Sequence, residues 1–407
     1  MAAKKTSKST KVSKVSKEIG NALLDHFKSN SKIHCNISDT NEFFSTGNKY
    51  IDTALGGGIC MRKITLLAGR PGSGKTTFGY NIMGAFQRNF NNKCIVLYID
   101  NEQSANNTRL RICGLDYENE ETQFIKVTGT LEDVFKAIDL CISFKESDSK
   151  YSEYPILVIW DSITSTSTEK GMEVEDHNKT MGLNANILSH ILPKYINKHF
   201  ITHNVTMVAI SQLRDKIDAG YIKQASDLKF MGGSNKRIPG GNALWHATGA
   251  LLLFEEKDIM KEEEYGFSAI IVRIKAVKNK YFTPNIPISV TMKHVTGFSD
   301  VWTNYLLMKE SKYLEAKGRY WEMKNYFELD KEGNPTETKK KFERKKLEYL
   351  YNTDTHFREV YDSNAIELIS LFEKKHNVSM EDLEELNKCI EESHESDISE
   401  DSDDDKI

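Results

Sequence analysis

Five short, nearly continuous apolar runs alternate along this 407-residue chain with segments whose hydrophobic residues recur at helical spacing. Because both faces of these runs are apolar, they predict strands of a parallel sheet with helices on both sides, which is the pattern of an α/β protein. The predicted strands are Ile64–Ala68, Cys94–Ile99, Phe124–Val127, Ile156–Trp160 and Thr206–Ser211.

Weaker patterns predict the elements outside this sheet. Residues 297–321 predict a helix and a short segment after it. Residues 329–346 predict a charged linker, broken by glycine and proline, with a basic run at 339–341. Further helices are predicted at 18–28, 46–58, 357–374 and 380–391. We assign the last two of these helices no function.

Composition adds a marked asymmetry of charge. The hydrophobic content of 39% is ordinary for one large core with a small appended domain. The formal net charge of −4 averages six lysines within residues 1–17 with nine carboxylates within residues 391–405. We therefore expect a disordered basic tail at 1–17 and a disordered acidic tail at 390–407.

The cysteines and the N-terminus bear on the compartment. The six cysteines form no C-x-x-C pair and show no metal-ligand spacing, which predicts reduced thiols in the cytoplasm or the nucleus. The Lys/Ser-rich opening lacks the apolar segment of a secretory signal; a transit peptide and a nuclear signal are the alternatives to a basic tail. No stretch approaches the roughly 18 apolar residues of a membrane span, so no membrane partner is expected.

The first predicted strand runs directly into a glycine loop that matches G-x-x-x-x-G-K-[ST]. Its glycines let main-chain N–H groups converge on phosphate oxygens, and the N-terminus of the next helix adds positive potential. Lys75 supplies a mobile cation, and the hydroxyl of Thr76 fits a Mg²⁺ ligand. A chance glycine turn is the alternative, but it would not explain the ordered strand, loop, lysine and hydroxyl. The predicted phosphate site comprises Gly69, Arg70, Pro71, Gly72, Ser73, Gly74, Lys75, Thr76 and Thr77.

Three polar residues follow other predicted strands and should meet at the same edge of the sheet. Asp161 could hold Mg²⁺ or its water, Glu102 could activate an attacking water, and Gln212 could sense a γ-phosphate. Each position alone is a weak signal, because polar residues commonly end strands. Together with the glycine loop they predict a nucleotide hydrolase site.

Over about residues 41–321 these motifs resemble the RecA/UvsX family of homologous recombinases of bacteria and bacteriophages. Residues 46–56 are similar to its lead-in, Asp100-x-Glu102 to its catalytic glutamate motif, and Asp161-Ser162 to its second nucleotide motif. Four further segments match in order: Met181-Gly182 at the end of the first DNA loop, Gln212-x-Arg214-x-Lys216 at the entry of the second, Gly240–Leu244 at its exit, and Lys278 and Lys280 as the lysine pair that reaches a neighbouring subunit's ATP.

The resemblance implies a RecA-like P-loop ATPase core at 45–296 and a small α+β C-terminal domain at 297–389. It also implies an N-terminal oligomerisation segment at 18–44, which contains the helix predicted at 18–28. It implies ATP and Mg²⁺ as cofactors, and single-stranded DNA, homologous duplex DNA and further copies of the chain in a helical filament as partners. Mediator and single-strand-binding proteins are further expected partners. The implied catalytic residues are Lys75, Glu102, Gln212, Lys278 and Lys280.

The chain departs from the family around the base of the nucleotide. Arg109 stands where the family has an adenine-stacking tyrosine, and Asn106 where it has an adenine-contacting aspartate. A guanidinium plane can stack on a base, so we keep Asn106, Arg109 and Pro284 as expected nucleotide contacts. Asn186 replaces a DNA-contacting arginine, which puts that contact in doubt.

Residues 213–239 form the expected second DNA loop, where basic and aromatic side chains alternate. Lysines and arginines would neutralise phosphates and the aromatic rings would stack on bases, as sequence-tolerant single-strand binding requires. A solvated surface loop is the alternative. The expected DNA-binding residues are Met181, Gly182, Arg214, Lys216, Tyr221, Lys223, Lys229, Phe230, Lys236, Arg237, Gly240, Gly241 and Asn242.

Three functions fit these motifs to different degrees. The leading hypothesis is an ATP-dependent recombinase that forms filaments on single-stranded DNA and exchanges strands. A hexameric helicase shares the core but would not be expected to carry the Gly240–Leu244 exit or the Lys278/Lys280 pair. The third is a recombination mediator or accessory ATPase-like module that is non-catalytic, with vestigial nucleotide binding. The intact Lys75, Thr76, Glu102 and Asp161 argue against it.

Overall fold

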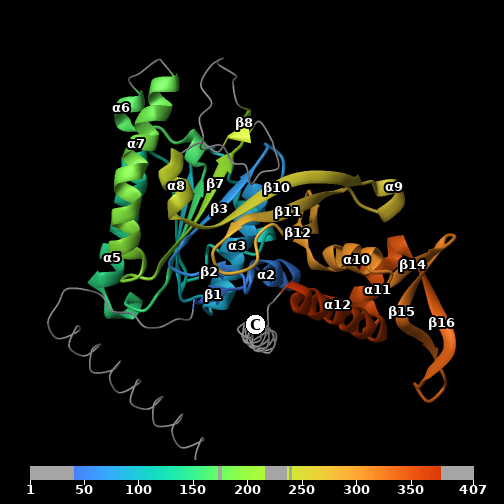
Figure 1. The fold of residues 1–407 in the computed structure, drawn as a ribbon. Coiled ribbons are helices and arrows are strands. Elements are labelled where there is room, and N and C mark those ends of the chain that lie inside the picture. The colour runs from blue at the N-terminus through green and yellow to red at the C-terminus, as the bar shows by residue number, and fades with distance from the viewer. Residues whose placement is uncertain (1–40, 173–176, 216–235, 238–240, 377–407) are drawn as a thin grey trace, which may run out of the picture. The chain divides into compact units, whose positions relative to one another are not determined.

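The computed structural model describes residues 41–172, 177–215, 236–237 and 241–376 (Figure 1). Both expected tails, the helix predicted at 380–391 and nearly all of the segment 18–44 lie outside the described residues. The domain boundaries therefore stay predictions. Six of the expected DNA contacts also lie outside the described residues: Lys216, Tyr221, Lys223, Lys229, Phe230 and Gly240.

A nine-stranded sheet in the order β13-β12-β11-β10-β3-β7-β6-β4-β5 forms the centre of the described chain. Its parallel part confirms the predicted α/β fold and all five predicted strands. The parallel strands are β3 (Ile64–Gly69), β4 (Ile95–Asp100), β5 (Gln123–Val127), β6 (Ile156–Asp161), β7 (Val205–Gln212) and β10 (Thr248–Met260).

Three further strands extend this sheet in antiparallel fashion beyond β10, an extension that the sequence patterns did not predict. They are β11 (Ala269–Asn279), β12 (Pro287–Lys293) and β13 (Gly297–Ser299). Because β13 pairs with β12, the chain is still part of the main sheet at the expected domain boundary of residue 297.

The pleat of the parallel strands divides their side chains between two hydrophobic cores. In β4, for example, Val96 and Tyr98 belong to the core on the α3 side. Ile95, Leu97 and Ile99 belong to the core that α5, α7 and α8 cover. This burial on both faces is the physical reason why these strands read as continuous apolar runs.

The helices that flank the sheet begin and end as follows. On the side of the first core lie α2 (Lys49–Leu55), α3 (Lys75–Asn89), α4 (Asn107–Ile112) and α10 (Asp300–Glu310). On the side of the second core lie α5 (Leu131–Ser147), α7 (His177–Tyr195), which continues as a π-helical turn at Ile196–Phe200, and α8 (Gly241–Ala247). The short helices α6 (Glu169–Met172) and α9 (Glu262–Tyr265) precede α7 and β11, respectively.

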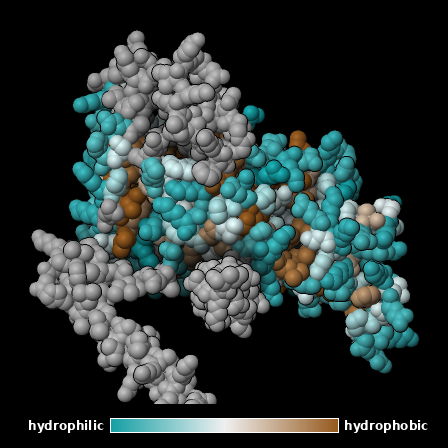
Figure 2. All heavy atoms as spheres, in the orientation of Figure 1, coloured by the Kyte–Doolittle hydropathy of each residue, from teal (hydrophilic) through white to brown (hydrophobic). Residues whose placement is uncertain are grey.

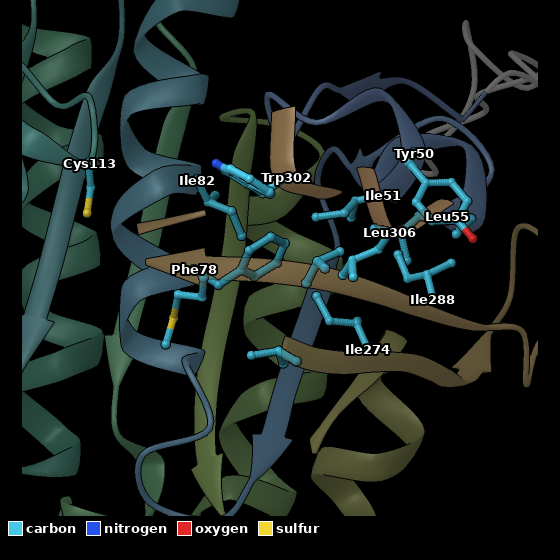
Figure 3. Close-up of a cluster of buried hydrophobic side chains, with 14 of the residues drawn as sticks. Tyr50, Ile51, Leu55, Phe78, Ile82, Cys113, Ile274, Ile288, Trp302 and Leu306 are labelled. Atoms are coloured by element: carbon cyan, nitrogen blue, oxygen red, sulfur yellow. The ribbon is translucent and has the colours of Figure 1, made fainter. Parts of the chain in front are cut away.

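Helix α2 lies within residues 46–58, as predicted, and ends at glycine. Gly56 adopts φ 82° and its N–H bonds the carbonyls of Asp52 and Thr53, which closes the last turn. The segment is clamped by a two-stranded ribbon, β1 (Phe43–Phe44) with β2 (Ile59–Cys60). Figure 3 shows side chains of α2 and α3 meeting those of β11 and β12 in the first core.

The prediction of a charged linker at 329–346 is wrong, because most of these residues form the turn and the second strand of a β-hairpin. β14 (Leu314–Lys317), β15 (Tyr320–Leu329) and β16 (Pro335–Glu343) make a three-stranded antiparallel sheet. In the turn, the carboxylate of Asp330 accepts main-chain N–H groups of Glu332 and Asn334 at 2.9 and 2.8 Å, and Gly333 takes φ 86°. The strand was missed because it exposes mainly lysine and threonine and buries little beyond Phe342.

Helix α11 (Leu347–Thr353) and helix α12 (Thr355–His376) complete the described chain, and α12 confirms the helix predicted at 357–374. The hydroxyl of Tyr361 in α12 donates to the carbonyl of Val301 at 2.6 Å, which ties α12 to α10.

On the face shown in Figure 2, hydrophilic residues predominate and hydrophobic ones gather in smaller patches. None of the described helices combines the length and the apolar character needed to cross a bilayer.

The contact between α3 and the turn after α4 yields a test of the packing. A Cβ on Gly84 would overlap the main-chain carbonyl of Gly114, whereas one on Gly79 would meet Ile159 and Ile210 at an ordinary 3.5 Å. We expect Gly84→Ala to lower the free energy of unfolding by about 1–3 kcal/mol, because two main chains would have to move apart. Urea unfolding measures it.

Gly79→Ala is the matched control, since both glycines lie inside α3 and both gain helix propensity from alanine. We expect it to change the free energy of unfolding by less than about 1 kcal/mol in either direction. Equal effects of the two substitutions would contradict the close packing of α3 on Gly114.

Candidate nucleotide-binding site

The glycine loop joins β3 to α3 at the carboxyl edge of the sheet. Gly72 and Gly74 adopt φ 79° and 91°, a region that residues with a Cβ rarely occupy. A Cβ on Gly69 would lie 2.6 Å from both the carbonyl oxygen of Phe254 and Oγ of Ser73. The geometry therefore requires glycine at these three places, and it leaves the N-terminus of α3 facing a cleft.

Lys75, the first residue of α3, is 5% exposed and lies across the loop. Its Nζ donates to the carbonyl of Arg70 at 2.7 Å and to Oγ of Ser73 at 3.4 Å. Burial lowers the pKa of Lys75, while the nearby carboxylates of Asp161 and Glu102 act in the opposite direction. A phosphate group in the cleft could take over these hydrogen bonds and favour the charged form.

Thr76 and Asp161 form the part of the site that could hold Mg²⁺. Oγ1 of Thr76 donates to Oδ2 of Asp161 at 2.7 Å, at the end of β6. Asp161 is fully buried, and its Oδ1 is a buried oxygen with no hydrogen-bond partner among the described residues. A hydroxyl and a carboxylate with an unsatisfied oxygen fit a hard cation or one of its waters.

Glu102 lies in the turn after β4, which Asp100 shapes by accepting the N–H groups of Ser104 and Ala105 at 3.0 and 3.1 Å. Its Oε1 accepts Nε2 of Gln212 at 2.7 Å, Oγ of Ser162 at 2.8 Å and Oγ of Ser165 at 3.2 Å.

The sequence did not predict that Ser162 and Ser165 would bond Glu102. The only signal for this contact was the polar run after β6, which forms a 3₁₀ turn at Ile163–Ser165. The structure thus brings Lys75, Thr76, Glu102, Asp161 and Gln212 together around one cleft.

This cleft, of about 570 Å³, continues past the loop to residues of two further walls. Arg109 of α4 lines it, and its Nη2 donates to Oγ1 of Thr77 at 2.9 Å. The opposite wall comes from β10, β11 and the end of β12, and no motif had indicated it. Its lining residues are Glu256, Ile259, Ser268, Ile270, Met292 and His294.

Two expected nucleotide contacts do not line the cleft in this structure. Asn106 is exposed and caps α4, because its Oδ1 accepts the N–H of Thr108 at 2.8 Å. Pro284 is exposed on the connection between β11 and β12. Both stay predictions for a nucleotide-bound state.

Lys278 and Lys280 lie near the end of β11 and do not line the chain's own cleft either. Their ammonium groups donate to main-chain carbonyls at the end of α8, Lys278 to Trp245 and Lys280 to His246. Burial, together with the charge of Lys280, lowers the pKa of Lys278 to about 8. The pair is thus attached to the helix that follows the second DNA loop.

The backbone of several expected DNA contacts is described. Met181 and Gly182 lie within helix α7. Arg214 pairs with Arg237, and Asp215 with Lys236, in a short antiparallel ladder of β8 (Arg214–Asp215) and β9 (Lys236–Arg237). Gly241 and Asn242 form the first turn of α8. The ladder closes the base of the expected loop, a feature that its polar sequence did not predict.

Fold and cleft together define a nucleotide-binding α/β protein with its site at the carboxyl edge of a parallel sheet. The family model described as "RecA N-terminal domain" matches residues 8–299. The chain belongs to the RecA family, a family of DNA-dependent ATPases.

Relatives named Protein RecA align over most of the chain. That of Trichodesmium erythraeum is 26% identical over 282 residues, which cover 69% of this chain and 70% of the relative. That of Clostridium tetani is 27% identical over 331 residues, with 80% and 85% covered. That of a Wolbachia species is 24% identical over 342 residues, with 81% and 87% covered.

The burial of Asp161 predicts an unusual dependence of stability on pH. Desolvation raises the pKa of this carboxyl from 3.8 to about 7 in the folded chain. Between these values the folded state binds a proton that the unfolded state releases, so stability should fall as the pH rises from about 4 to 7. We expect Asp161→Asn, measured by urea unfolding without nucleotide or Mg²⁺, to be more stable than wild type at pH 8 by up to about 4 kcal/mol.

That advantage should shrink toward pH 4, where both residues are neutral. Asp133→Asn is a control with the opposite sign, because hydrogen bonds from Thr130 lower the pKa of Asp133, so its substitution should destabilise at pH 8. A pH-independent difference between wild type and Asp161→Asn would show that Asp161 is already charged in the free protein.

Proposed function

We propose that the chain is an ATP-dependent homologous recombinase that forms filaments on single-stranded DNA and pairs them with homologous duplex DNA. One observation carries the proposal: a hydrogen bond joins the cleft to the end of β7, two residues before the base of the expected DNA loop. Glu102 bonds the side chain of Gln212, and Arg214, two residues further on, begins the ladder at the base of that loop. Membership of the RecA family supports the same function.

In the proposed reaction Lys75 and the amides of the glycine loop hold the β- and γ-phosphates of ATP. Thr76 and Asp161 would hold Mg²⁺, which supplies charge neutralisation on the phosphate oxygens when it is bound. Glu102 orients and deprotonates the attacking water as general base. Its three hydrogen-bond donors fix the carboxylate in place.

Gln212 reports the nucleotide to the DNA loop. Its amide nitrogen now donates to Glu102 at 2.7 Å, and an oxygen of a γ-phosphate would compete for the same donor. Because Gln212 ends β7 and Arg214 begins β8, a shift of this amide would displace the ladder at the base of the loop. ATP would thereby change the affinity for DNA, and DNA the affinity for ATP.

Lys278 and Lys280 act on the nucleotide of a neighbouring copy. They lie away from the chain's own cleft but are anchored to α8, directly after the DNA loop. Two ammonium groups placed across an interface would neutralise charge that develops on the transferred phosphoryl group. Hydrolysis would then require assembly.

The test of this function compares wild type with Glu102→Gln. We expect the wild-type chain to hydrolyse ATP faster with single-stranded DNA and to form helical filaments in electron micrographs. Glu102→Gln should bind ATP and form filaments but hydrolyse at least about 100-fold more slowly, because it lacks the general base. Glu118→Gln, which alters an exposed ion pair with Arg111, is the matched control and should behave as wild type.

The outcomes separate the functions. Rings in place of filaments would favour a hexameric helicase, and a wild-type chain that binds no ATP would favour an accessory role. Near-normal hydrolysis by Glu102→Gln would remove Glu102 from the role of base.

Mixing two inactive variants tests whether the lysines act in trans. Lys75→Ala prevents a subunit's own cleft from binding ATP. Lys278→Ala/Lys280→Ala leaves that cleft intact but removes the lysines that would act on the neighbour's nucleotide. In an equimolar, randomly mixed filament about a quarter of the interfaces would combine an intact cleft with intact lysines, so about a quarter of wild-type ATP turnover should return.

The control is a chain that carries all three substitutions, mixed with either of the two variants. In neither mixture does any interface combine an intact cleft with intact lysines, so turnover should stay near that of the inactive parents. No recovery in filaments shown to contain both variants would place the lysines outside the neighbour's site.

A further inference from the structure

Beyond the phosphate loop, the nucleotide cleft carries a fixed arginine. Arg109 lines the cleft and donates through Nη2 to Oγ1 of Thr77 at 2.9 Å. Thr77 is 5% exposed and belongs to the first turn of α3, next to the proposed Mg²⁺ ligand Thr76. The guanidinium is therefore held a short distance along α3 from the phosphate site, where the sugar and base of a nucleotide would follow.

Arg109 brings hydrogen-bond donors to this part of the cleft. A guanidinium has five N–H donors and no acceptor. Within the described part of the chain, Thr77 is the only residue to which Arg109 donates from its side chain. Asn106, three residues before Arg109, does not line the cleft and uses its Oδ1 to cap α4.

Adenine and guanine differ in what they present to such donors. The edge of guanine carries two adjacent acceptors, O6 and N7, and a guanidinium fork matches both. Adenine presents N7 but has an amino group where guanine has O6, and that group needs an acceptor. Asn106 supplies no such acceptor, because it lies outside the cleft lining and its oxygen caps α4.

The wall formed by β10, β11 and the end of β12 is mixed. Ile270 and Met292 present apolar surface that can pack on any purine face, and polar side chains of the same wall also line the cleft, namely Glu256, Ser268 and His294. Discrimination between bases therefore falls to the polar side chains, and Arg109 is fixed in the cleft by its bond to Thr77.

We propose that the cleft accepts guanine nucleotides as well as ATP, with Arg109 donating to O6 and N7 of guanine. The inference rests on the proposed function, because it needs the cleft to hold a nucleoside triphosphate. It assigns to Arg109 a role in choosing the base, so that GTP serves as a second substrate of the same site.

The experiment measures equilibrium binding of unlabelled ATP, GTP, ITP and 7-deaza-GTP with Mg²⁺, by competition against a fluorescent ATP analogue, on the full chain. In wild type, the affinity for GTP should lie within about tenfold of the affinity for ATP, because one good contact to the edge of a base changes an affinity by about that factor. ITP, which keeps O6 and N7, should follow GTP. 7-deaza-GTP, which lacks N7, should bind more weakly than GTP.

Variants of Arg109 then assign the effect. Arg109→Tyr should lower the affinity for GTP about tenfold more than the affinity for ATP, since a ring can stack on either base but cannot donate to O6 and N7. Arg109→Lys should also weaken GTP, because it keeps the charge and loses the planar fork. Arg111→Tyr is the matched control: Arg111 lies on the same helix, pairs with Glu118 at 2.7 Å and does not line the cleft, so both affinities should stay as in wild type.

Three results would overturn the inference. GTP binding more than about 100-fold weaker than ATP in wild type would show that the cleft excludes guanine. Equal loss of ATP and GTP in Arg109→Tyr would show that the arginine acts on the phosphates or on the base face alone. Binding of neither nucleotide would overturn the proposed function as well, whereas ATP binding without GTP binding overturns this inference alone.

Discussion

A hydrogen bond between Thr76 and Asp161 joins the two parts on which the site depends: the first turn of α3 and the end of β6. β6 lies between β7 and β4 in the sheet, so fixing its end also fixes the ends that carry Gln212 and Glu102. The bond is made inside the protein, where Asp161 is fully buried and its pKa rises to about 7. A carboxylate in such a place is unfavourable until a cation or a donor compensates it, so a cation bound beside Asp161 would stabilise the charged form.

Two kinds of residue surround this bond. The residues beside the glycine loop are positioned by the sheet, because Glu102, Asp161 and Gln212 lie at the ends of adjacent parallel strands or directly after them. The other walls of the cleft come from elements whose positions the glycine motif does not determine. Helix α4 supplies Arg109, and the antiparallel extension of the sheet supplies Ile270 and Met292. The residues proposed for phosphate transfer thus lie on the most constrained part of the fold, whereas the residues proposed to contact the base lie on elements outside it.

The same division explains what could be predicted from the sequence. The five parallel strands were predicted correctly because burial on both faces makes them apolar throughout. The glycine loop could be recognised because its motif is a run of neighbouring residues, and the phosphate that it would bind stays a prediction. β16 was missed because an exposed edge strand rich in lysine and threonine has no apolar pattern to detect. The far wall of the cleft was missed because its residues meet the loop only through sheet pairing, and the bonds of Ser162 and Ser165 to Glu102 depend on how the chain turns after β6.

If the lysine pair acts at a subunit interface as proposed, its electrostatics would favour assembly. In the isolated subunit Lys278 is partly buried, lies over the ring of Trp245 at 4.8 Å and is close to a second ammonium group, so its pKa falls to about 8. A neighbour's triphosphate would reverse the effect, because several negative charges near Lys278 favour its protonated form. The charge that is unfavourable in the free subunit would then become favourable at the interface. By linkage, contact with the nucleotide of the next subunit would take up a fraction of a proton near pH 8, and a loaded cleft would bind a neighbour more tightly than an empty one.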